Sequence, residues 1–181
     1  KAIEKETYWK NSEYLENKIQ TEKTRDIHEF ERGPELLKGV IESNKPTDLI
    51  GSLPVGAYEI EVTTMTEEKS EYSHRFELFD ENSKQLAIPS TFEFKAIKMN
   101  AEPGEEASFL IGSSLANLKL LYEIHVNGKR ISQQWITLNK EQRKITLPIK
   151  ESYRGGVQVN LIGIYNNRTI EHEQRITVPY T

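Results

Sequence analysis

Residues 154–168 read RGGVQVNLIGIYNNR, and this stretch decides how the second half of the chain folds. Apolar and polar residues alternate over 157–161, which is the period of a strand with one buried face. A glycine pair precedes the run, and Asn166-Asn167 separates it from a second extended run; both residue types favour turns. The pattern predicts one antiparallel hairpin over residues 156–178, which closes a β-sandwich and holds no ligand.

Five more extended segments are expected upstream of this hairpin. They are Phe92–Phe94, Ala107–Ser113, Leu118–Val126, Ile131–Leu138 and Lys144–Ile149. Asn127-Gly128 is the strongest short hairpin signal, because both residues tolerate the positive φ of a type I′ turn. Seven strands at this spacing predict a two-sheet sandwich of the immunoglobulin-like kind.

The first half shows a similar but shorter pattern. Residues 57–62 read AYEIEV, with apolar side chains at positions 58, 60 and 62 and glutamates at 59 and 61. This alternation predicts a half-buried antiparallel strand. After a charged turn, Tyr72–Phe79 is expected to return as its partner, with the side chains at positions 74, 76 and 78 on one face.

Five polar residues, Asp80–Lys84, interrupt the pattern and indicate a domain boundary. The predicted domains are residues 1–82 and residues 83–181. The run Leu53–Gly56 precedes an alternating strand much as residues 147–156 do, which suggests two tandem modules of one architecture.

The first 50 residues are the least regular part. A short helical or irregular lead-in is expected over residues 1–23, followed by two strands at Arg25–Gly33 and Leu36–Glu42. The predicted fold class is therefore all-β, with two tandem immunoglobulin-like antiparallel β-sandwich modules, the first of which need not be complete.

Composition excludes several classes of protein. Hydrophobic residues make up 36% of the 181 residues and charged residues 29%, which is typical of a folded domain with a well-solvated surface. The net charge of −4, with no basic stripe among aromatics, argues against nucleic-acid binding. No apolar run reaches the roughly 20 residues that span a bilayer, so no direct membrane insertion is expected. The chain begins at Lys1, and we expect it to be a fragment of a longer polypeptide.

Cysteine is absent, which removes disulfides, thiolate metal sites and thiol nucleophiles together. The four histidines, His28, His74, His125 and His172, fall in four different expected strands, without the spacing of a metal-binding pair. No metal site is predicted, although His172 is a candidate for titration at acid pH.

No set of residues indicates catalysis. The carboxylate pairs Glu67-Glu68, Glu105-Glu106 and Glu171 with Glu173 are expected in turns or on the outward face of a strand, not across a cleft. Ser113-Ser114 lacks the glycine spacing of a nucleophile elbow and reads as a strand end. We predict no enzyme, no catalytic, cofactor-binding or metal-binding residues, and no cofactor.

Trp135 is the residue whose position stays open. It is in phase with Gln133 and Thr137, not with Ile136, so it either faces outward or packs at an edge. An exposed tryptophan would offer a stacking platform for a carbohydrate. A cell-surface adhesin or carbohydrate-binding module is therefore the alternative function.

Over residues 50–181 the sequence resembles the macroglobulin-like domains of large bacterial alpha-2-macroglobulin-type proteins. The segments that carry this resemblance are Leu53–Ile60, Ala101–Ser114, Leu121–Ile124, Ile145–Ile149, Tyr153–Gly156 and Val178–Tyr180. The resemblance implies structural and interaction modules of a protease-trapping protein. It also implies neighbouring domains of the same polypeptide and proteases as partners.

The resemblance further implies a periplasmic or cell-surface protein, with a lipid anchor outside this chain as one way of holding it there. In that family a protease cuts a bait segment, and a Cys-Gly-Glu-Gln thioester in a separate domain captures it. This chain has no cysteine, and Glu141-Gln142 lacks the rest of that motif. No catalytic residue of the family is therefore carried onto this chain.

Overall fold

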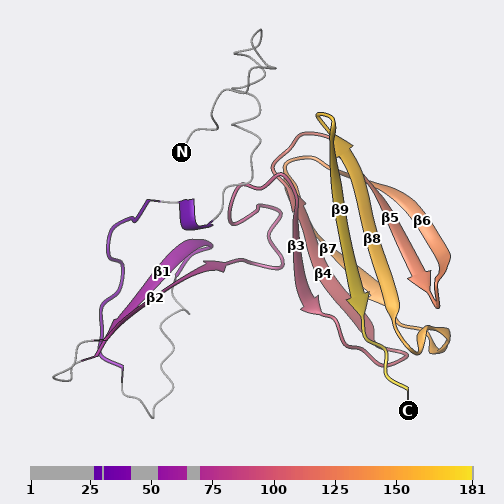
Figure 1. Ribbon diagram of the computed structural model, residues 1–181, viewed down its shortest axis with the longest axis horizontal. Coiled ribbons are helices and arrows are strands. Elements are labelled where there is room, and N and C mark those ends of the chain that lie inside the picture. The colour runs from indigo at the N-terminus through magenta and orange to yellow at the C-terminus, as the bar shows by residue number, and fades with distance from the viewer. Residues whose placement is uncertain (1–26, 30, 42–52, 65–69, 181) are drawn as a thin grey trace, which may run out of the picture.

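A computed structural model of the chain describes residues 27–29, 31–41, 53–64 and 70–180. This part contains nine strands and two short 3₁₀ turns, and all pairings between the strands are antiparallel. Two strands form a separate hairpin, and the other seven form a two-layered sandwich (Figure 1). The all-β fold class is confirmed.

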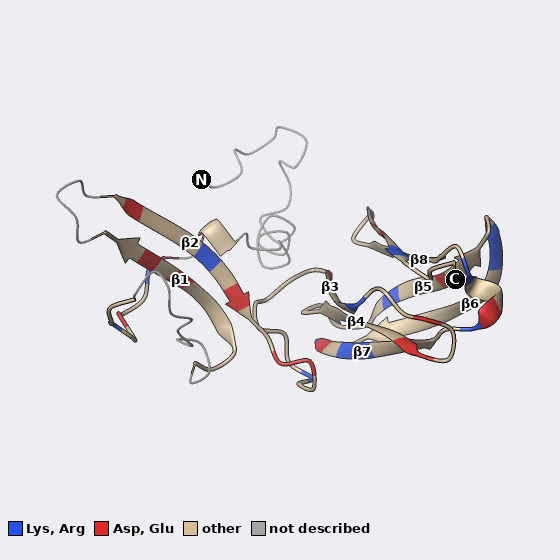
Figure 2. Cartoon of the chain, turned by 90° about the horizontal axis from the view of Figure 1, so that it is seen from below, with Lys and Arg blue, Asp and Glu red and all other residues tan. Residues whose placement is uncertain are grey.

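Seven strands make up the sandwich, as the sequence predicts. One sheet has the order β3-β4-β7, formed by Glu93–Lys98, Glu106–Ser113 and Glu141–Pro148. The other has the order β6-β5-β8-β9, formed by Lys129–Leu138, Leu118–Val126, Val157–Tyr165 and Arg168–Ile176. The two sheets lie face to face, seen end-on in Figure 2. This is an immunoglobulin-like arrangement in which the fourth strand, β6, pairs with β5 instead of with β7.

Two-residue turns fix the register of both long hairpins. Asn127 and Gly128 have φ of 50° and 74°, and Val126 pairs with Lys129. Asn166 and Asn167 have φ of 47° and 58° and join β8 to β9. Positive φ at both central residues matches the right-handed twist of the flanking strands. The predicted hairpin at residues 156–178 is therefore confirmed.

The core lies between the two sheets. Val157, Val159 and Leu161 alternate along β8 and are each 0% exposed. Opposite them, Phe109 of β4 is also fully buried, and its ring centroid lies 4.9 Å from that of Phe94. Burying side chains of this size contributes about 1.5–3 kcal/mol each, so this interior is the main stabilising feature of the chain.

The strand β4 is buried on both faces over its second half, which explains the unbroken apolar run Phe109–Ile111. Its outward-facing Leu110 is 2% exposed, and Ile88 of the preceding segment is 9% exposed. Leu86 packs against Gly112, where a Cβ would lie 3.1 Å from the leucine Cγ. The segment before β3 therefore covers the outer face of β4.

The chain crosses between the two sheets after β3. Asn100 forms a parallel bridge with Thr177, just beyond the end of β9. Thr177 N donates to Met99 O at 2.8 Å, and Ala101 N donates to Thr177 O at 3.2 Å. These bonds join the two layers along one side and partly cover the edge at the end of β9.

The separate hairpin consists of β1 (Gly56–Thr63) and β2 (Glu71–Leu78). Tyr58 pairs with Phe76, and their rings stack with centroids 5.9 Å apart. Ile60 pairs with His74 on the same face. The predicted strand, its partner and their shared face are confirmed.

The opposite face of this hairpin is polar. Glu59 accepts hydrogen bonds from Ser73 Oγ at 2.5 Å, from Arg32 at 2.9 Å and from Arg75 at 3.2 Å. The hydrogen bond from Ser73 is the largest cause that lowers the pKa of this carboxylate. Burial opposes it, and the guanidinium groups of Arg32 and Arg75 lower the pKa further. Arg75 also donates to the carbonyl of His28 at 2.9 Å, which holds the upstream segment beside β2.

The two strands predicted before residue 43 are wrong where the structure describes that region. Ile27–Glu29 forms a 3₁₀ turn, so His28 is not in a strand, and residues 31–41 contain no strand. Leu36 and Val40 are 59% and 73% exposed. An extended segment becomes a strand only where a neighbour offers a ladder, and none of the described strands pairs with this one.

The lead-in predicted over residues 1–23 lies outside the described residues. Among the described residues before the sandwich, the strands form a single hairpin. The domain boundary near residue 82 stays a prediction.

Candidate interaction surface

The outer face of the four-stranded sheet carries an apolar strip across three adjacent strands. Trp135 of β6 pairs with Leu121 of β5, which in turn pairs with Ile162 of β8. Trp135 is 67% exposed and Ile162 is 37% exposed. Ile164, two residues farther along β8, is 73% exposed. The register of the hairpins thus gathers apolar side chains on a surface that the sandwich does not cover.

A charged cluster lies beside this strip on the same face. Glu123 is only 7% exposed, and it accepts a bond from Arg130 Nη1 at 2.7 Å. His125 Nε2 lies 3.1 Å from its second carboxylate oxygen. The hydrogen bond from Arg130, and next the one from His125, lower the pKa of Glu123. The ion pair joins β5 to β6 across the bulge at Ile124 and His125.

A second group of charges lies where the hairpin meets the sandwich. Lys95 of β3 pairs with Glu77 at the end of β2, with 2.6 Å between Nζ and Oε1, and also pairs with Glu93. Its ammonium lies 5.1 Å from the centroid of the Phe79 ring. The lysine side chain is 13% exposed and both glutamates are 19% exposed. Burial raises the pKa of Glu93, and Lys95 opposes that shift.

Gln142 of β7 fixes the segment that joins the two parts. Its Nε2 donates to the carbonyl of Asp80 at 2.7 Å and to that of Ser83 at 3.0 Å. Its backbone N–H donates to Lys84 O at 2.8 Å. Lys144 and Glu81 form an exposed ion pair nearby, at 2.9 Å. The junction is therefore a docked segment and not a free linker.

His172 of β9 packs against two phenylalanine rings, one in β3 and one just before it. Its ring centroid lies 4.1 Å from that of Phe94 and 6.1 Å from that of Phe92. Its Nε2 is buried and has no hydrogen-bond partner within the described part of the chain. Burial lowers the pKa of this imidazole. The group predicted to titrate at acid pH thus faces inward and not into solvent.

The other histidines lie far apart in the fold. His74 is on β2 and His125 is on β5, and His28 is in the 3₁₀ turn. Over the described residues, no group of three or more histidine, aspartate or glutamate side chains could hold a metal ion.

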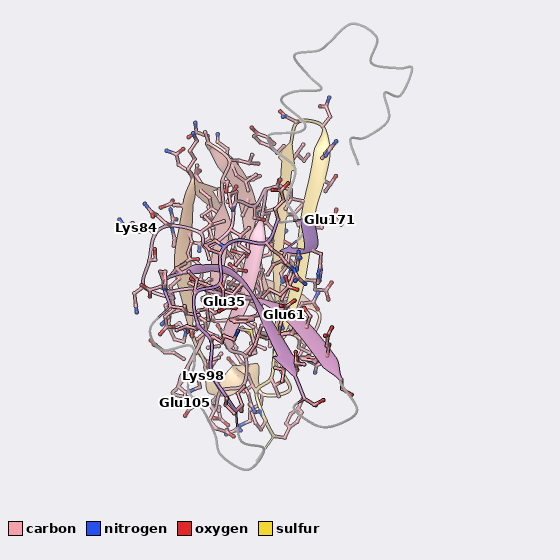
Figure 3. All side chains as sticks on the ribbon, turned by 90° about the vertical axis from the view of Figure 1, so that its left-hand side faces the viewer. Glu35, Glu61, Lys84, Lys98, Glu105 and Glu171 are labelled. Carbon is pink, nitrogen blue, oxygen red and sulfur yellow. The ribbon has the colours of Figure 1, made fainter. Side chains whose placement is uncertain are left out.

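The remaining sequence candidates have structural contacts. Ser113 is fully buried, and its hydroxyl donates to Thr91 O at 2.6 Å and accepts from Leu115 N at 3.0 Å. It ends β4, as predicted. Glu105 forms an ion pair with Lys98 at 3.0 Å, labelled in Figure 3. Glu171 lies on the outward face of β9, and Glu67-Glu68 lies outside the described residues.

The sequence missed the Glu123–Arg130 and Lys95–Glu77 pairs. The sequence does contain a signal for the Glu123–Arg130 pair. The Asn127-Gly128 turn places Arg130 opposite His125, two residues from Glu123 on the same face. No local signal predicts the Lys95–Glu77 pair, because it joins β3 of the sandwich to β2 of the separate hairpin.

No family model matches this chain, and no curated protein matches it. Among solved structures, it is similar to domains d3–d4 of the extracellular region of rat CD45. The identity is 10%, the match covers 81% of this chain and 78% of that chain, and the TM-score is 0.25. A likeness this distant adds nothing to the fold described above. In the described part, no helix is long and apolar enough to cross a bilayer.

Proposed function

We propose that this chain is a structural and interaction module of a larger protease-trapping protein of the alpha-2-macroglobulin type. The observation that supports this role is the docked junction between the hairpin and the sandwich. Lys95 is shared by Glu77 and Glu93, and Gln142 binds two carbonyls of the connecting segment. A free linker would need none of these contacts.

Such a junction suits a protein that works by changing shape. If consecutive modules are held at fixed angles, a cut in one part of the array shifts the others as rigid bodies. The chain itself supplies no covalent chemistry in this proposal. Its partners are the adjoining domains of its own polypeptide and the trapped protease, in the periplasm or at the cell surface.

The test uses the complete polypeptide and trypsin. Trapping leaves the hydrolysis of a small chromogenic peptide nearly unchanged and strongly reduces the digestion of casein, because the enclosed protease admits only small substrates. The double variant Lys95→Met/Gln142→Ala is expected to trap less well, since it loosens the junction. Equal digestion of both substrates with and without the polypeptide would contradict the proposal.

The exposed Trp135 supports one alternative, a carbohydrate-binding module of a cell-surface adhesin. Its ring is 67% exposed and lies beside Leu121 on an open sheet face, as a stacking platform requires. A glycan-array signal that is lost in Trp135→Ala and retained in Trp135→Phe would support it. Absence of any signal counts against it.

A further inference from the structure

The sandwich has four edge strands, and three of them carry features that discourage pairing with another chain. The edge strand β3 bears charges and a bulge, and β7 bears charges and ends in Pro148. The third, β9, carries two arginines and two glutamates, and the Asn100 bridge lies at its end. Charges, proline and bulges are the usual protections of an exposed edge.

The fourth edge, β6, lacks these protections over most of its length. Residues 131–138 read ISQQWITL, without a charge, a proline or a glycine. The one irregularity of this strand lies before Ser132, near its start. At ten residues β6 is the longest strand described, and Ile131 and Trp135 are 48% and 67% exposed along it.

The backbone N–H and C=O groups of successive β6 residues point alternately toward β5 and away from it. Thr137 O accepts a bond from Arg143 Nη2 at 3.1 Å, so this carbonyl faces away from β5. In a strand the N–H and C=O of one residue point to the same side, and every second residue points these groups in the same direction. Gln133 and Trp135 therefore turn their backbone groups outward. These groups have no partner among the described residues.

The charges around this edge indicate what would pair with it. Lys129 lies at the start of β6, and Lys140 follows its end. Lys119 pairs with Thr137 near that same end. A second copy added antiparallel would bring the lysines at one end of each strand near those at the other end of its partner, which is repulsive. An extended segment with acidic ends would complement them.

We propose that β6 binds an extended segment of a partner protein by strand addition, with an uncharged centre and an acidic residue near each end. The outward backbone groups of Gln133 and Trp135 would supply the hydrogen bonds, and Trp135 would pack against an alternate side chain of the segment. This inference does not rest on protease trapping, since it concerns the edge alone.

The test is an NMR titration of the full chain with a blocked ten-residue synthetic peptide of alternating threonine and valine, with a glutamate at each end. The amide signals of Gln133 and Trp135 should shift and exchange more slowly with solvent, while those of β9 stay unchanged. The same peptide with lysine ends should bind about tenfold more weakly or worse. No shift at millimolar peptide would overturn the proposal.

Two variants distinguish peptide binding at the β6 edge from peptide binding on the outer face of the sheet. Gln133→Pro removes an outward N–H without touching the β5 ladder, and it should weaken binding more than about tenfold. Ile164→Lys alters the same outer face on the interior strand β8 and should leave binding unchanged. Trp135→Lys provides a second edge variant if the proline variant is unfolded by circular dichroism.

Two results would overturn this assignment. Loss of peptide binding in Ile164→Lys with retention in Gln133→Pro would place the site on the face. A concentration-dependent dimer in sedimentation velocity, lost in Gln133→Pro, would assign the edge to a second copy of the chain.

Discussion

The hairpins β1–β2 and β8–β9 have the same sequence pattern, but only the second is part of a closed core. Val157, Val159 and Leu161 are fully buried, whereas Val62 of β1 is 37% exposed and Tyr72 of β2 is 61% exposed. The difference is that a second sheet faces β8 and no described sheet faces β1. Alternation makes a strand, but only an opposing layer makes a core.

The largest expected effect comes from breaking the core. Phe109→Ala should lower the free energy of unfolding by about 3–5 kcal/mol, because it leaves a cavity between the sheets. Phe76→Ala on the open hairpin should cost less than about 2 kcal/mol, since the surrounding side chains are partly solvated. Guanidinium denaturation followed by far-ultraviolet circular dichroism measures both. Equal losses would show that the hairpin is as well packed as the sandwich.

A close approach within the sandwich gives the next effect. A Cβ at Gly163 would lie 2.7 Å from Leu120 Cδ2 and 2.8 Å from Lys119 O. Gly163→Ala should therefore destabilise the chain by about 1–3 kcal/mol. Gly39→Ala is the matched control, because a Cβ there meets nothing within 4 Å. A thermal unfolding midpoint that is the same in both variants would contradict this.

The junction between the two regions can be tested by charge removal. Lys95→Met leaves Glu77 and Glu93 close together without their shared cation and should cost about 1–2 kcal/mol, between an exposed and a fully buried pair. It should also speed cleavage of residues 79–92 in limited proteolysis. Lys98→Met breaks only the exposed pair with Glu105 and should have little effect. Equal proteolysis of both variants would argue against a docked junction.

The smallest effect is a pH dependence from His172. Because burial lowers its pKa in the folded chain, the unfolded chain binds a proton first as the pH falls below about 6.5. Stability should therefore decline below that pH, until the folded-state pKa is passed. His172→Phe removes this contribution, so the difference between variant and parent in urea midpoint should change between pH 7 and pH 5. A constant difference would show that His172 does not titrate with folding.

Local sequence patterns predicted the sandwich strands because their signals are short-range. The Asn127-Gly128 turn and the alternation of β8 each depend on neighbours within a few residues. The predicted strands before residue 43 failed for the opposite reason, since pairing needs a partner elsewhere in the chain. Trp135 was left open between the face and the edge, and the structure shows that it lies on the outer face of an edge strand.

By itself, the sequence determined the all-β class, the seven strands, the turns and the side chains that point inward. These follow from a period of two residues and from positive φ at asparagine and glycine. The tertiary structure alone decided that Lys95 joins two regions, that Gln142 holds the connecting segment and that β6 is left as an unprotected edge. Each of these depends on which strands become neighbours, and that is set by the packing of the two sheets rather than by any local pattern.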